Sequence, residues 1–100
     1  MEGYYINSSG EKTIIPSVTK VLDISYRNIV EIVCNRELET LYCHNNLLTK
    51  LTLNNKLETL FCNSNKLKEL KLNDKLEYLS CRINIKLDNI NPNTYITLHE

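Results

Sequence analysis

The stretch LETLYCHNNLLTKLTLNNK at residues 38–56 is followed directly by LETLFCNSNKLKELKLNDK at residues 57–75. The two copies share leucines, a cysteine and asparagines at a spacing of 19 residues, and a third copy begins at Leu76, another 19 residues on. A fixed short period of this kind is typical of proteins that stack one structural unit repeatedly. The chain is therefore predicted to form a β-rich solenoid.

The apolar residues of each copy predict a strand, a corner and a second short segment. Leu41 and Cys43 are two residues apart, so on a strand both side chains point to the interior. Leu48 and Leu51 then return to the interior through an extended or single-turn 3-10 segment, because the arc is too short for an α-helix. One coil buries too little apolar surface to offset the entropy of ordering its backbone, so stacking must supply the stability.

An asparagine follows the strand cysteine of each copy by three residues, at Asn46, Asn65 and Asn84. A coil that turns a corner leaves backbone N–H and C=O groups inside, and the carboxamide of asparagine can both donate and accept hydrogen bonds. We therefore expect these side chains to point inward and to form hydrogen bonds with the buried backbone groups of the corner. The alternative is that they are ordinary turn residues on the surface.

The resulting frame, Leu-x-x-Leu-x-Cys-x-x-Asn-x-Leu-x-x-Leu-x-Leu, resembles the leucine-rich repeat, whose signature is Leu-x-x-Leu-x-Leu-x-x-Asn/Cys-x-Leu. The match covers residues 18–98, and its 19-residue unit resembles the compact variety found in bacterial and giant-virus proteins. The resemblance implies a right-handed coil with a parallel, concave β-sheet and an extended or 3-10 convex side. It also implies a scaffold that binds partners without catalysis.

The chain is expected to form a single domain over residues 1–100. Residues 1–17 contain two strand-like runs around a turn, and they predict a β-hairpin that caps the first coil. Residues 18–94 hold the repeats, and residues 95–100 form either a terminal strand or a truncated repeat. Arg27 stands at the first asparagine position, which is compatible with an atypical first repeat.

The third repeat is expected to slip. Leu87 and Ile90 lie one position later than the preceding copy predicts. With that slip, Pro92 occupies the position at which an apolar residue would close the coil.

Composition excludes several functions. Twelve basic and twelve acidic residues give zero net charge, which removes the electrostatic case for nucleic acid and for an anionic membrane surface. No apolar run reaches the length of a membrane span, and no secretion signal is visible. We therefore expect a cytoplasmic protein, in the host cytoplasm if it is a viral protein or an effector.

The four cysteines, at positions 34, 43, 62 and 81, contain no Cys-x-x-Cys pair. We interpret them as buried core residues; the alternative is a metal or redox site, although thiols in one line do not form a tetrahedron. Glu39, Glu58 and Glu77 form a similar column, interpreted as a solvated rim near Lys56 and Lys75, with a cation site as the alternative. No cofactor and no metal are expected.

His44 has no cysteine nucleophile beside it, because Cys43 is expected to point inward, and the sequence contains no glycine-rich phosphate loop and no paired carboxylates. His44 and His99 are expected to be ordinary exposed surface residues. We therefore expect no enzymatic activity.

The outward face of the strands is the candidate site. Aromatic side chains there are not required by the fold, and aromatic residues and arginine are enriched at interface hot spots. The alternative is that they only stack across strands and stabilise the sheet. The predicted partner-binding residues are Asp23, Thr40, Tyr42, His44, Thr59, Phe61, Asn63, Tyr78, Ser80 and Arg82.

The sequence thus predicts a protein–protein interaction module that binds a protein partner on its strand face. One alternative is a structural or self-associating unit, either a monomer or a weak homodimer through a coil end. Another is the recognition part of a ubiquitin-ligase adaptor or a pathogen effector.

Overall fold

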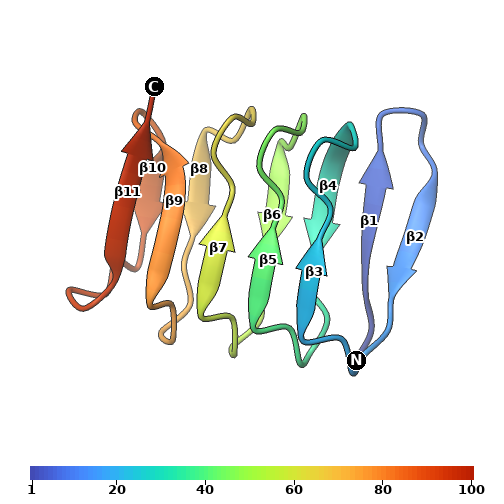
Figure 1. The fold of residues 1–100 in the computed structure, drawn as a ribbon, viewed down its shortest axis with the longest axis horizontal. Helices are drawn as coiled ribbons and strands as arrows, with labels where there is room; N and C mark the ends of the chain where they lie inside the picture. The colour runs from blue at the N-terminus through green and yellow to red at the C-terminus, as the bar shows by residue number, and fades with distance from the viewer.

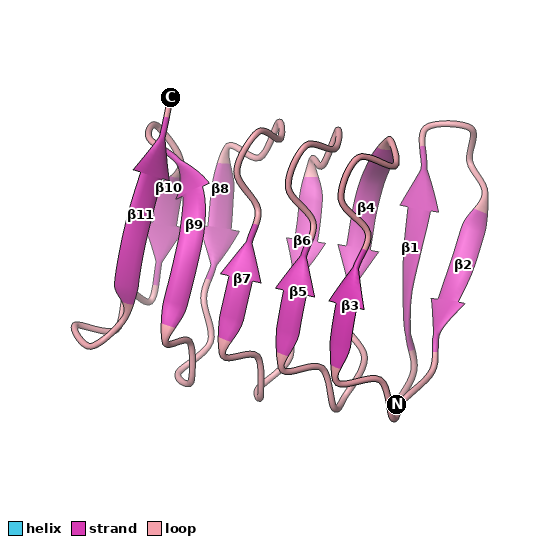
Figure 2. Cartoon of the chain, viewed as in Figure 1, coloured by secondary structure: helices cyan, strands magenta, loops and turns pink.

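The computed structural model describes all 100 residues and shows a β-solenoid built from strands alone (Figures 1 and 2). The strands are β1 (Gly3–Asn7), β2 (Lys12–Ile15), β3 (Val21–Asp23), β4 (Ile29–Val33), β5 (Thr40–Tyr42), β6 (Lys50–Thr52), β7 (Thr59–Phe61), β8 (Glu69–Lys71), β9 (Tyr78–Arg82), β10 (Lys86–Asp88) and β11 (Tyr95–His99). None of its segments is a helix that could cross a bilayer.

The coils place their strands on two faces. The front sheet is parallel and has the order β11-β9-β7-β5-β3, and the back face carries two sheets with the orders β2-β1-β4-β6 and β10-β8. Figure 1 shows β5, β7 and β9 in front of the back strands, with the chain advancing from one end of the solenoid to the other. The side opposite the front sheet is therefore extended, as expected, and the 3-10 alternative is not seen.

The core runs between the two faces as columns of apolar side chains. Leu22, Leu41, Leu60 and Leu79 occupy equivalent positions of successive front strands, and the last three are 0% exposed. The strand thiols are equally buried, as the two-residue spacing predicts. Each fully buried aliphatic side chain stabilises the fold by roughly 1.5–3 kcal/mol.

The inward asparagine is confirmed in two of the three copies. The Nδ2 of Asn46 donates to the carbonyl oxygens of Ile24 (2.9 Å) and Cys43 (3.0 Å), and its Oδ1 accepts from the backbone N–H of Arg27 (2.8 Å) and Ile29 (3.0 Å). The side chain therefore joins its own coil to the preceding one.

Asn65 repeats this arrangement one coil later. Its Oδ1 accepts from the N–H of Leu48 at 2.9 Å, and its Nδ2 donates to the carbonyl oxygen of Cys43 at 2.9 Å. The reading of these asparagines as plain turn residues is thus wrong for Asn46 and Asn65.

The third copy differs from both the asparagine prediction and the predicted slip. Leu87 lies opposite Leu70 and Tyr95 lies opposite Tyr78, so this coil is two residues shorter than the others. The shortening falls between β9 and β10, and it leaves Asn84 exposed with no side-chain hydrogen bond. Pro92 is also exposed, in the turn that precedes β11.

A second asparagine column, which the sequence analysis did not identify, occupies the opposite corner. The Nδ2 of Asn54 donates to the carbonyl oxygens of Asn35 (2.7 Å) and Leu38 (2.8 Å), and its Oδ1 accepts from the N–H of Leu57 at 2.7 Å. Asn73 donates to the equivalent carbonyl groups one coil later. The signal was in the sequence, since residues 35, 54 and 73 are 19 apart.

The predicted N-terminal hairpin is confirmed. Strands β1 and β2 pair antiparallel, and β1 also pairs antiparallel with β4, so the hairpin extends the back face beyond the first coil. Ile15 joins the core at 2% exposure. Gly3 is buried, and a Cβ atom there would clash with backbone atoms of Val33, Cys34 and Asn35.

Replacing Asn46 by alanine should lower the free energy of unfolding by at least about 2 kcal/mol, because several buried backbone groups lose their partner. Urea unfolding followed by circular dichroism measures this. The matched control is Asn84→Ala, from the same column of the sequence, which should change stability by less than about 0.5 kcal/mol. Equal losses in the two variants would contradict the corner assignment.

Gly3→Ala should destabilise the hairpin by about 1–3 kcal/mol, because the added methyl group has to displace backbone of β4 and the residues after it. Amide hydrogen exchange in β1 and β4 reports the loss locally. The control is Gly10→Asn, in the open hairpin turn, where an added Cβ meets no neighbour. Gly10 has a φ of +82°, a left-handed conformation that asparagine adopts at less cost than most residues. Unchanged protection in Gly3→Ala would refute the close packing.

Candidate interaction face

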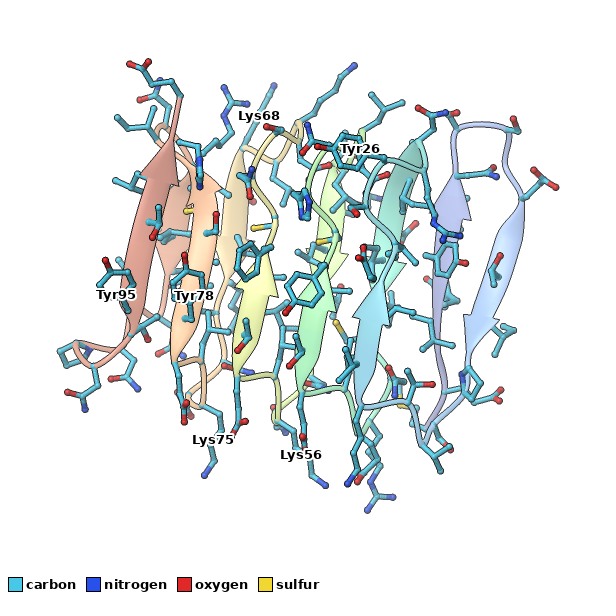
Figure 3. All side chains as sticks on the ribbon, viewed as in Figure 1. Tyr26, Lys56, Lys68, Lys75, Tyr78 and Tyr95 are labelled. Atoms are coloured by element: carbon cyan, nitrogen blue, oxygen red, sulfur yellow. The ribbon has the colours of Figure 1, made fainter.

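The outward side of the front sheet carries a continuous aromatic ladder, defined as Tyr42, Phe61, Tyr78 and Tyr95. Successive ring centroids lie 5.0, 5.2 and 5.6 Å apart, and the rings become more nearly parallel along the series, from 42° to 32° to 14°. Figure 3 shows Tyr78 and Tyr95 side by side on β9 and β11. Adjacent strands are about 4.8 Å apart, so stacked rings follow directly from the parallel register.

The ladder crosses from one column of residues to the next. Phe61 lies directly opposite Ser80, yet its ring contacts Tyr78, the diagonal neighbour. Diagonal neighbours are within reach of aromatic side chains. The rings of Tyr78 and Tyr95 are stacked, whereas those of Tyr42 and Phe61 and of Phe61 and Tyr78 are tilted. Tyr95, at the end of the ladder, is 68% exposed.

The stacking interpretation therefore describes real contacts. Each aromatic pair contributes about 0.5–1.5 kcal/mol beyond its buried area. Tyr42, Phe61 and Tyr78 are half-buried, so Phe61 is less exposed than the sequence suggests. Contact with neighbouring rings therefore leaves part of each side chain exposed and available for contact with another molecule.

A histidine and a further tyrosine lie beside the ladder. His44 packs edge-on against Tyr26, with centroids 5.7 Å apart, and lies 6.2 Å from Phe61. The Nδ1 of His44 is buried and has no hydrogen-bond partner. His44 is thus half-buried, and the expectation of an exposed histidine is wrong.

Asp23 lies at the first-coil edge of this face and is exposed. Its Oδ1 accepts from the hydroxyl of Ser25 at 2.7 Å and from the backbone N–H of Ser25 at 3.1 Å. These two hydrogen bonds, with smaller contributions from the nearby His44 and Arg27, lower the pKa of Asp23. The face therefore has an anionic end.

Ser80 lies on this face but is only 1% exposed. Its hydroxyl donates to Oδ1 of Asn63 at 3.0 Å and contacts Nε2 of His99 at 2.7 Å. Since a serine has one hydroxyl proton and Asn63 Oδ1 can only accept it, Nε2 of His99 is the donor. His99 is therefore half-buried and bonded instead of freely exposed, and it cannot act as a base toward Ser80 in this arrangement.

The remaining predicted residues divide by position. Thr40 and Thr59 are half-buried beside the ladder, and Arg82 is half-buried at the end of β9. Sequence reasoning missed four residues of this face, namely Tyr26, Tyr95, Thr97 and His99. The last three were missed because a constant period of 19 does not align β11 with β9; Thr97 makes a 3.1 Å hydrogen bond with the Tyr78 hydroxyl.

The glutamate column lies at one edge of the sheet together with lysines. Glu39, Glu58, Lys56 and Lys75 line one shallow cleft, and Figure 3 shows the two lysines on that edge. Lys56 forms its ion pair with Glu37 at 2.8 Å, not with a member of the column. A cation would have to compete with these ammonium groups.

The four cysteines are free and buried, as the core interpretation predicts. Burial raises the pKa of the Cys34 thiol from 9.0 to about 12 and raises the pKa of each of the other three thiols. A neutral, buried thiol is a poor nucleophile and a poor metal ligand.

Comparison of the chain with protein-family models, with curated proteins and with solved structures finds no match.

The native thiols should resist a disulfide reagent at pH 8, while all four should react in denaturant, because burial keeps them protonated and covered.

The raised pKa values also predict lower stability as pH rises above about 9, since the unfolded thiols then ionise and the folded ones do not. The measurement is the free energy of unfolding of wild type and of Cys34→Ala at several pH values above 9. With each pH unit, the free energy of unfolding should fall by up to about 1.4 kcal/mol more in wild type than in Cys34→Ala. Identical slopes would contradict the prediction.

Proposed function

We propose that this chain is a leucine-rich-repeat-type solenoid that binds a protein partner on the outward side of its front sheet. In this proposal the coil is right-handed, the front sheet is its concave face and the hairpin is its N-terminal cap. The domain division is residues 1–17, 18–94 and 95–100. The partner contacts the ladder, His44 and Asp23, with Thr40, Thr59, Asn63 and Arg82 around them.

The observation that carries the proposal is the aromatic ladder on a face that the core does not need. The inward columns hold the coils together, so Tyr42, Phe61 and Tyr78 could be small polar residues without opening the core. Ring edges carry partial positive charge, and the phenol groups of Tyr42 and Tyr78 donate and accept hydrogen bonds. A partner surface with carbonyl or carboxylate oxygens around apolar side chains matches this chemistry.

The proposal assigns no catalytic step to the chain. Ser80 is covered, and its hydroxyl proton is directed to Asn63, which supports a binding role over nucleophilic chemistry. Four reduced thiols in the core favour a reducing compartment, so we place the protein in the cytoplasm. Recognition within an adaptor or effector would use the same face and is one form of this function.

The test is affinity capture with wild type and Phe61→Ala, alone and combined with Tyr42→Ala. The partner complex should weaken by about tenfold or more for each anchor removed, as for interface hot spots. The fold should persist, with a loss of about 1–3 kcal/mol from broken stacking.

The matched control is Tyr4→Ala, an aromatic residue of the hairpin whose hydroxyl bonds Glu31. That variant should retain the partner. Capture that is unchanged in the Phe61→Ala and Tyr42→Ala double variant, or global unfolding by Phe61→Ala, would refute the assignment of this face.

A further inference from the structure

The core is covered at one end of the solenoid and open at the other. Ile24 begins the column that continues through the strand thiols to Leu98, which lies opposite Cys81. Ile24 is 2% exposed, whereas Leu98 is 52% exposed. Within residues 1–100 the back face ends at β10, and none of the strands of these residues lies behind β11. Leu98 is therefore a core-facing residue without a core neighbour on its far side.

The backbone of β11 is also unpaired along its outer edge. Strand β11 pairs only with β9, and the N–H of Tyr95 donates to Glu77 while the C=O of His99 accepts from Ile83. In a parallel pair, alternate residues direct both backbone groups to the same side. Residues 95, 97 and 99 thus face β9, and the N–H and C=O of Ile96 and Leu98 face outward.

The exposed edge strands at the two ends of the molecule, β2 and β11, differ in whether they contain residues that discourage pairing with another strand. The outermost hairpin strand, β2, begins with Lys12 and is followed by Pro16, both of which discourage edge pairing. The sequence of β11, YITLH, contains no lysine, no proline and no acidic residue. The β11 edge therefore lacks the usual protection against pairing with another strand.

We propose that β11 pairs antiparallel with β11 of a second copy of this chain, about a two-fold axis that passes between the two Thr97 residues. In this register Ile96 lies opposite Leu98 of the second copy, and the reverse holds across the axis. Both residues have their backbone groups directed outward, so the pair forms four hydrogen bonds and leaves no outward N–H or C=O of Ile96 or Leu98 unpaired. The side chains of Ile96 and Leu98 of each copy pack against those of the other copy and cover its open core end.

The same register joins the two candidate faces. A two-fold axis perpendicular to the sheet keeps both outward sides on one side of the dimer, and Tyr95 comes to lie opposite His99 of the second copy. The exposed ring of Tyr95 thereby gains His99 of the second copy as a neighbour, and the two candidate faces lie side by side on one surface of the dimer. This inference concerns the assembly of the protein and goes beyond its binding to another partner.

Sedimentation equilibrium from micromolar to millimolar concentration tests the association. The wild-type chain should form a dimer, and Leu98→Asp should weaken it by at least about tenfold, because each dimer would bury two carboxylates, each opposite the apolar side chain of Ile96. The matched control is Ile14→Asp, which places the same charge on an exposed isoleucine of β2 at the opposite end. That variant should associate like wild type, and circular dichroism should show that both variants are folded.

A cysteine at the axis tests the register. Opposed residues in a non-hydrogen-bonded antiparallel pair have Cα atoms about 4.5 Å apart, within the range that a disulfide spans. Thr97→Cys should therefore form a covalent dimer on mild oxidation, while Thr13→Cys, on the exposed β2, should not.

Three results would overturn the proposal: a wild-type chain that stays monomeric at millimolar concentration, equal weakening by Leu98→Asp and Ile14→Asp, or no cross-link through Thr97→Cys.

Discussion

The structure depends on the hydrogen bonds that the buried backbone N–H and C=O groups form where each coil turns. A corner directs N–H and C=O groups into a space from which water is excluded, and an unpaired buried group of this kind costs about 1–3 kcal/mol. Asn46 and Asn54 resolve the problem at the two opposite corners, and each bonds to its own coil and to the preceding one. The smallest satisfied unit is therefore a pair of neighbouring coils, and the asparagines make stacking obligatory.

This constraint explains the two exceptions in the repeat. Arg27 stands where later coils carry an asparagine. The backbone of the first corner nevertheless has hydrogen-bond partners, because Oδ1 of Asn46 accepts from the N–H groups of Arg27 and Ile29. At the other end, the shortened third coil turns too early for Asn84 to reach the corner of the second. The chain tolerates this at the periphery, where Ile83 and Asn84 are exposed to water.

In the proposed function, one set of side chains on the front sheet serves both stability and recognition. Parallel strands hold Tyr42, Phe61, Tyr78 and Tyr95 at stacking distance, so each ring is ordered by its neighbours before any partner arrives. Rings that are already ordered lose little conformational entropy on binding. Stacking and the proposed recognition are thus compatible, because the contacts between neighbouring rings leave Tyr42, Phe61 and Tyr78 only half-buried.

The sequence by itself determined the period, the inward leucine and cysteine columns, the hairpin and the outward position of the predicted face. These follow from local rules, since strand side chains alternate and a spacing of 19 residues superimposes successive coils. Only the tertiary structure decided the length of the last coil, the exposure of Asn84, the addition of Tyr95 to the ladder and the covering of Ser80 by Asn63 and His99. Each of these depends on which residues of different coils lie opposite one another, and a shortening by two residues changes that register without disturbing the alternation of side chains along either strand.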